Sequence, residues 1–237
     1  MKRDQIFQAL ATLRKGLLRV IGAVVLLSFI LYPFSKTLLR HLQSPLRQDL
    51  VAFALPEALL SLVKLTLYTS LFLSVPLIFY QLWKAFSPLF RLKGLKSDLL
   101  VLLASIFLFY LGSSFCYFVT LPFGIRFLLG YQSAHIQPMI SVGKYLSFCA
   151  GFIFAFGIIF ELPLILALLS LIRIVNVGLL TRNRRYAILM IAILSAVLTP
   201  TPDFFNMTLM GGPLYLLFEI GIILVRMVEG KTAAAGG

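Results

Sequence analysis

One carboxylate lies in the middle of a long apolar segment. The stretch IFAFGIIFELPLILALLSL covers residues 153–171 and contains Glu161, with Pro163 two positions later. A charge at the centre of a membrane costs at least ~2.5–3.5 kcal/mol, so we expect Glu161 to face protein or a watery cavity, or to be protonated. Two roles fit it. It anchors backbone that Pro163 loosens, or it is a polar site on an inner face that thins the bilayer or contacts a partner helix.

A second polar group follows a short apolar block near the C-terminus. Asp203 ends the turn TPTPD (199–203) and is expected to cap the next helix. Thr199, Thr201 and Asn206 could instead form a small polar cluster for a side chain of a partner helix, where each hydrogen bond contributes ~1 kcal/mol. Met207 belongs to the same candidate contact.

The residue types that usually perform catalysis or bind metals are sparse. His41 and His135 are far apart without ligand spacing, and Cys116 and Cys149 both lie in apolar segments as small buried hydrophobes. We therefore expect no cofactor, no metal and no enzymatic activity. An ion-coupled small-molecule transporter or channel with Glu161 at its midplane is the alternative, although the internal repeats typical of transporters are not recognisable.

The composition places these residues in a membrane. Of 237 residues, 60% are hydrophobic and 12% are charged, about half the charged fraction of a soluble domain. The apolar residues form long blocks, which is typical of helices that face lipid. The net charge of +13 comes from basic residues between these blocks, so it does not indicate a nucleic-acid-binding protein. The sequence predicts an all-α integral membrane protein with a single domain.

Six spans are expected within a membrane domain of residues 1–230, followed by a disordered tail at 231–237. They cover about residues 19–34, 59–82, 99–121, 145–172, 186–198 and 204–225. The fifth reaches only about 20 Å at 1.5 Å per residue, so it borrows flanking residues or crosses a thinned bilayer. The first is read as an uncleaved span. Pro33, Pro76, Pro163 and Pro213 are expected to interrupt four spans and to curve the bundle.

The distribution of basic residues predicts the orientation. Fifteen lysines and arginines lie at the two termini and in the loops after spans two and four, and five lie in the remaining loops. The positive-inside rule then places both termini in the cytoplasm. Of the outer loops, residues 35–58 are expected to form short amphipathic helices on the membrane surface, and residues 122–144 an ordered cap.

Six segments, in this order and spacing, have a familiar pattern: PLIFYQLWKAFSPLF (76–90), YFVTLPFGIRFLLG (117–130), ISVGKYLSF (140–148), FAFGIIFELPLIL (154–166), LTPTPD (198–203) and PLYLLFEIG (213–221). They resemble the C subunit of the twin-arginine protein translocase, the TatC family, and the resemblance runs from about residue 10 to 228. It favours the functional role for Glu161.

The resemblance implies a curved, glove-like six-helix bundle with a periplasmic cap. It also implies a receptor in the bacterial or archaeal cytoplasmic (inner) membrane that recognises twin-arginine signal peptides of folded precursors. Such receptors form oligomeric complexes with TatB-like and TatA-like single-span subunits, and the proton-motive force drives export.

Both carboxylates of the family's signal-peptide site are replaced. Guanidinium groups pair bidentately with carboxylates, and the family places a glutamate where this chain has Thr12 and another where it has Gly94. By resemblance the binding face comprises Thr12, Leu13, Arg14, Gly94, Lys96 and Asp98. Asp98 is a substitute acid one turn after Gly94, or a charge at a helix N-terminus. The remaining basic surface repels a twin-arginine peptide, so we expect altered recognition. Met207 stands where family members can have glutamine.

Overall fold

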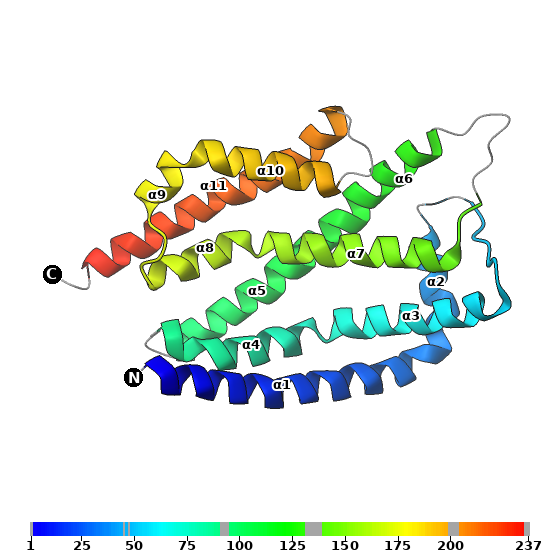
Figure 1. The fold of residues 1–237 in the computed structure, drawn as a ribbon, viewed down its shortest axis with the longest axis horizontal. Helices are drawn as coiled ribbons and strands as arrows, with labels where there is room; N and C mark the ends of the chain where they lie inside the picture. The colour runs from blue at the N-terminus through cyan, green and yellow to red at the C-terminus, as the bar shows by residue number, and fades with distance from the viewer. Residues whose placement is uncertain are drawn as a thin grey trace. The chain divides into compact units, whose positions relative to one another are not determined.

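A computed structural model describes residues 2–44, 46, 48–90, 95–130, 139–198 and 204–234, and these are helical almost throughout (Figure 1). The chain divides into two compact units. Unit 1 comprises Met1–Phe86 and Ser113–Ala155, and unit 2 comprises Ser87–Gly112 and Phe156–Gly237. Each unit is described by itself below.

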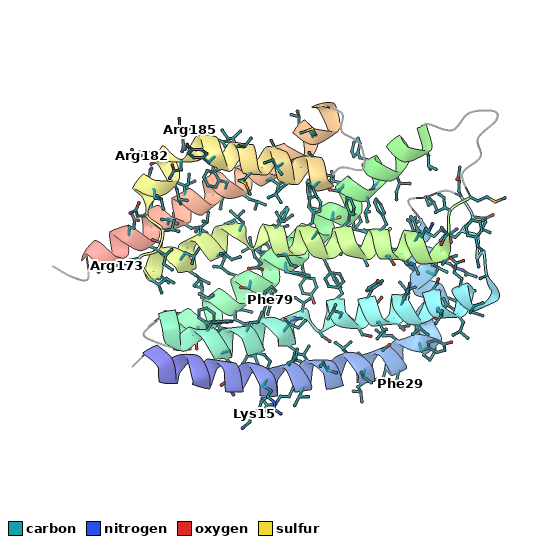
Figure 2. The ribbon with its side chains drawn as sticks, in the orientation of Figure 1. Lys15, Phe29, Phe79, Arg173, Arg182 and Arg185 are labelled. Atoms are coloured by element: carbon teal, nitrogen blue, oxygen red, sulfur yellow. The ribbon has the colours of Figure 1, made fainter. Side chains whose placement is uncertain are left out.

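Unit 1 begins with a long helix whose apolar side chains are largely exposed. α1 (Lys2–Leu31) leads through a 3₁₀ turn (Tyr32–Phe34) into α2 (Ser35–Gln43). On α1, Leu18 is 65%, Leu26 64% and Phe29 78% exposed, and Phe29 projects away from the neighbouring helices (Figure 2). Such a surface is stable against lipid but not against water. The nine-residue α2 confirms a short amphipathic helix within residues 35–58.

The second predicted span consists of two helices. α3 (Leu55–Leu73) and α4 (Val75–Phe90) meet at Ser74. Pro76 has no N–H, and its ring displaces the carbonyl four residues earlier. Pro33 and Pro163 likewise follow the starts of new helical segments. Pro213 differs, because it lies inside an uninterrupted helix, so the expectation that all four prolines interrupt spans is wrong at this position.

The third helix is longer than predicted. α5 (Leu95–Phe115) continues through a π-helical turn (Cys116–Thr120) into α6 (Leu121–Gly130). The helix therefore runs nine residues past the predicted end of the third span at residue 121, into the segment expected to form an ordered cap. Pro122 is tolerated because it follows the wider turn, where the regular i→i−4 ladder is already shifted. Residues 131–138 of the expected cap lie outside the described residues.

Hydrogen bonds join the loop segments of unit 1 to α7 (Val142–Phe160). The Val51 N–H donates to the Ile140 carbonyl at 2.9 Å, and the Val142 N–H donates to the Val51 carbonyl at 3.2 Å. Glu57 accepts from the Phe53 N–H at 2.7 Å and from the Ser141 hydroxyl. Leu65, Val142 and Leu146 form a buried cluster, against which four leucines pack: Leu38, Leu39, Leu42 and Leu50.

Unit 2 contains α8 (Leu162–Leu171), α9 (Val177–Arg182), α10 (Arg184–Leu198) and α11 (Phe204–Ala234). Its core is Ile191, Leu214, Phe218 and Ile222. Arg173 takes the left-handed conformation (φ 60°) after α8, and the Ile174 N–H donates to the Leu169 carbonyl at 3.0 Å, which is a Schellman cap. α11 continues to Ala234, so the predicted disordered tail is wrong for residues 231–234.

Five helical runs in the described residues are long and apolar enough to cross a membrane: Arg14–Gln43, Pro56–Leu73, Ser97–Arg126, Val142–Leu171 and Met210–Gly230. α10 has 15 residues and a length of about 22 Å at 1.5 Å per residue. It adds only Arg184 and Arg185 to the predicted fifth span. Because both are charged, they do not lengthen its apolar part.

Candidate functional site

A pocket of about 200 Å³, lined by residues with polar or charged side chains, lies between α1 and α4 in unit 1. Its lining residues are Thr12, Lys15, Arg19, Gln81 and Lys84. Three of these five side chains are cationic and none is acidic. Gly16 brings the two helices together, because a Cβ there would lie 3.1 Å from Gln81 Oε1. Gln81 itself is only 7% exposed, so its amide forms the floor of the pocket.

The other predicted signal-peptide residues do not form one described cluster. Arg14 is exposed on α1, and Asp98 is half-buried in the first turn of α5. Asp98 belongs to unit 2 and Thr12 to unit 1. Leu13 and Lys96 lie on α1 and α5, but their side chains are outside the described residues, as is the whole of Gly94.

The pocket contains four residues that the sequence-based prediction missed: Lys15, Arg19, Gln81 and Lys84. A signal for them exists in the spacing. Thr12, Lys15 and Arg19 follow at intervals of three and four, which places them on one helical face. Gln81 and Lys84 are likewise three residues apart. Periodicity alone could not show that these two faces meet.

Glu161 occupies the break between α7 and α8. It is the residue before α8, and its side chain is 6% exposed. The Ser105 hydroxyl of α5 hydrogen-bonds the carboxyl group, while Oε1 has no hydrogen-bond partner among the described residues. The Glu161 carbonyl accepts from the Ile165 N–H at 2.9 Å, so the backbone ladder resumes directly after Pro163. Glu161 thus faces protein, as the membrane cost requires.

The predicted partner-helix contact lies mostly outside the described residues. Thr199, Thr201 and Asp203 fall in the undescribed segment 199–203, and the Asn206 side chain is also outside the description. Met207 is half-buried near the start of α11.

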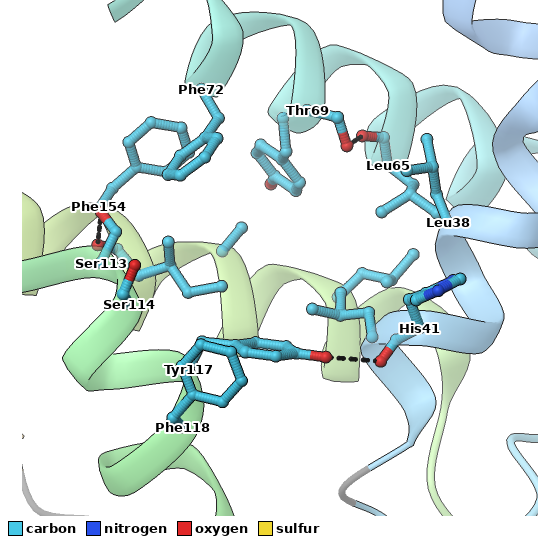
Figure 3. Close-up of a pocket in the computed structure, with 15 residues that line it drawn as sticks. Leu38, His41, Leu65, Thr69, Phe72, Ser113, Ser114, Tyr117, Phe118 and Phe154 are labelled. Carbon is cyan, nitrogen blue, oxygen red and sulfur yellow. Dashed lines mark hydrogen bonds between the residues drawn. The ribbon is translucent and has the colours of Figure 1, made fainter. Parts of the chain in front are cut away.

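A second cavity in unit 1, of about 330 Å³, is mainly apolar (Figure 3). Three of its polar side chains are hydrogen-bonded within the protein. The Tyr117 hydroxyl donates to the His41 carbonyl at 2.9 Å, Thr69 donates to the Leu65 carbonyl at 2.8 Å, and Ser113 donates to the Ile153 carbonyl at 3.2 Å. This cavity can therefore offer an apolar chain contact area but few hydrogen bonds.

Basic segments gather at one end of unit 2. The Val177 N–H donates to Glu229 Oε1 at 3.0 Å, which joins the start of α9 to the last turns of α11. Arg173, Arg182 and Arg185 lie around α8, α9 and α10 at this end (Figure 2). Glu219 pairs with Arg184 at 2.9 Å and accepts from the Tyr215 hydroxyl at 2.8 Å, so its charge is compensated within unit 2.

Comparison with known proteins gives the family. A family profile described as "Sec-independent protein translocase protein (TatC)" matches residues 8–213. The chain belongs to the TatC family. It is 39% identical over 94% of its length to a TatC of Desulforapulum autotrophicum, covering 84% of that protein. It is 33% identical to the Escherichia coli K12 TatC, covering 94% of the chain and 88% of that protein.

A solved TatC structure has the same fold. The "Crystal Structure of Twin Arginine Translocase Receptor- TatC" matches with a TM-score of 0.77 and 32% identity, over 93% of this chain and 99% of that one. The match to TatC confirms the predicted all-helical, six-span membrane fold. Thr12 and Gly94, where the family resemblance predicts glutamates, both lie within the residues that the TatC profile matches.

Proposed function

We infer that this chain is the membrane receptor subunit of a twin-arginine translocase, with altered signal-peptide recognition. The observation that carries the receptor role is the similarity over 99% of a solved TatC receptor. The observation that carries the alteration is the cationic pocket around Thr12. Thr12 offers a neutral hydroxyl where the family pattern has an ion-pairing glutamate.

The wider role follows from the family. The chain works with other translocase subunits, which we take to be TatA-like and TatB-like single-span proteins, in an oligomeric receptor complex in the cytoplasmic membrane. Thr199, Thr201, Asp203, Asn206, Met207 and the buried Glu161 remain its predicted partner contacts. It acts as a non-enzymatic scaffold, and the proton-motive force drives export. The family match does not favour the ion-coupled transporter.

Electrostatics support altered recognition. A guanidinium entering the pocket meets the like charges of Lys15, Arg19 and Lys84, and its lining holds no carboxylate. Juxtaposed like charges oppose association, whereas a charge-assisted hydrogen bond to a carboxylate contributes about 1.5–3 kcal/mol. Asp98 stays the candidate acid for residual binding.

Peptide binding tests this proposal. The protein is purified in detergent and titrated with a twin-arginine signal peptide and with a twin-lysine control peptide. We expect weak binding with little preference for arginine. The Thr12→Glu/Gly94→Glu variant should bind the twin-arginine peptide at least tenfold more tightly, because two carboxylates each gain a charge-assisted pair.

A matched variant controls for net charge. Thr37→Glu/Ser44→Glu adds two carboxylates at exposed positions in and directly after α2, far along the chain from the site, and should not change peptide affinity. Tight, arginine-selective binding by the unmodified chain would overturn the altered recognition. Asp98→Asn would then show whether Asp98 has replaced the missing glutamates.

A further inference from the structure

We propose that the pocket between α1 and α4 binds the phosphate of an anionic glycerophospholipid from the cytoplasmic leaflet. The placement in this leaflet rests on the proposed function and orientation. The binding chemistry rests on the pocket itself, whose lining combines three cations with a hydroxyl and an amide. This set matches a phosphodiester, which accepts several hydrogen bonds and carries one negative charge.

The cations come from two helices and surround one polar space. Lys15 and Arg19 are one turn apart on α1, and Lys84 is contributed by α4. All three are exposed, and Lys15 extends out from α1 (Figure 2). The buried Gln81 amide lies beneath them. A headgroup can thus enter from the membrane surface without displacing packed side chains.

Apolar surface for the acyl chains begins directly beside the cations. Leu17 is 60%, Leu18 65% and Ile21 50% exposed on α1. A lipid is therefore favoured over a soluble phosphate, because its chains gain contact with these residues while its phosphate meets Lys15 and Arg19. Basic pockets between helices on the cytoplasmic side are a recurrent way to recognise anionic headgroups. The same lining repels guanidinium groups, so lipid binding and altered peptide recognition have a common electrostatic cause.

Native mass spectrometry of the full chain in detergent tests the proposal. The protein is titrated with phosphatidylglycerol and, separately, with phosphatidylcholine. We expect phosphatidylglycerol to bind tens of times more tightly. In the Lys15→Gln/Lys84→Gln variant this affinity should fall about 30-fold, from ~1 kcal/mol for each cation lost, and approach that of phosphatidylcholine.

A charge-matched control separates a site from general attraction. Lys36→Gln/Lys64→Gln removes the same charge from exposed residues outside the pocket lining and should leave the phosphatidylglycerol preference unchanged. Equal losses in both double variants would overturn the proposal. Gln81→Leu is a second test, expected to weaken phosphatidylglycerol severalfold while all three cations remain.

Soluble competitors identify the source of the anion. Glycerol 3-phosphate, inorganic phosphate and an acidic peptide are each added to the phosphatidylglycerol complex. None should displace the lipid at equal concentration, and displacement by any of them would overturn a lipid site. The twin-arginine signal peptide is also titrated against the same protein preparations. Loss of phosphatidylglycerol preference refutes only the lipid site, and tight twin-arginine binding refutes only the altered recognition.

Discussion

At position 12 this chain has a hydroxyl where the family resemblance predicts a carboxylate, and the expected consequence reaches beyond one lost hydrogen bond. A glutamate there would offset one of the three charges of Lys15, Arg19 and Lys84, which share its pocket. With threonine the pocket is uniformly cationic. The lining then carries three positive charges instead of a net two, which disfavours guanidinium groups and favours anions. The proposed loss of peptide affinity and the proposed lipid site therefore share one cause.

Glu161 presents the reverse situation, a single acid in apolar surroundings. It lies among buried neighbours at the junction of α7 and α8 and shares one hydrogen bond with Ser105. A buried ionised carboxylate is costly unless it is paired. Its value to the fold must therefore come from shape and hydrogen bonding as much as from charge.

Two substitutions at Glu161 separate these contributions. Glu161→Gln keeps the size and the bond to Ser105 while it removes the charge, so we expect thermal stability in detergent to be unchanged or higher. Glu161→Ala leaves Ser105 without this partner and should lower the free energy of unfolding by about 1–3 kcal/mol. Equal destabilisation by both variants would show that the charge itself stabilises the fold.

Close helix contacts in this chain depend on glycine. In unit 2, a Cβ on Gly112 of α5 would lie 2.6 Å from the Phe156 carbonyl oxygen and 2.6 Å from Phe160 Cγ of α7. Small residues let helix backbones approach closely in a membrane, where apolar burial between helices adds little. The α5–α7 contact is therefore a packing interaction that a single methyl group disturbs.

Gly112→Ala tests this contact. Because the obstructing atom belongs to the backbone, the helices must separate, and we expect the free energy of unfolding to fall by about 1–3 kcal/mol. Gly151→Ala on α7 is the matched control, since its Cβ would meet nothing within 4 Å. It should gain up to about 1 kcal/mol from helix propensity. Unfolding in mixed micelles measures the free energy of unfolding of both variants. Equal changes would show that the close approach of α5 and α7 at Gly112 does not determine stability.

Across the whole chain, the charge distribution predicts the orientation, and within each unit segments that are assigned to the same side lie together. In unit 1 the pocket brings Lys84 to the N-terminal half of α1. In unit 2 the Val177–Glu229 bond brings the loop after α8 to the end of α11. Thus the segments that the positive-inside rule assigns to the cytoplasm lie together within each unit.

Cysteine labelling checks the orientation. Lys36→Cys should react with a membrane-impermeant maleimide on intact spheroplasts, and Arg182→Cys only after lysis. The native Cys116 and Cys149 are 0% exposed and should stay unlabelled, so the unmodified chain is the blank. The opposite pattern would place the termini outside the cytoplasm.

Properties that depend on runs of consecutive residues could be predicted from the sequence alone. The length of the apolar blocks predicted the membrane, the helices and the short α10, because crossing a bilayer depends on consecutive residues. Motif order indicated the family, and the same resemblance predicted that Thr12 and Gly94 stand where the family has glutamates. Helix ends were less accessible: α6 runs through Pro122 because a π-helical turn precedes it, a shift that propensity does not reveal.

Proximity between distant residues required the folded chain. Lys84 and Lys15 are 69 positions apart in the numbering, and they share a pocket only because Gly16 lets α1 approach Gln81. Ser105 likewise contacts Glu161 only in the folded chain, where α5 packs against the α7–α8 junction. Hydropathy and charge are properties of each residue and its neighbours in sequence. The binding chemistry of a pocket depends on which helix faces meet, and side-chain packing determines that in three dimensions.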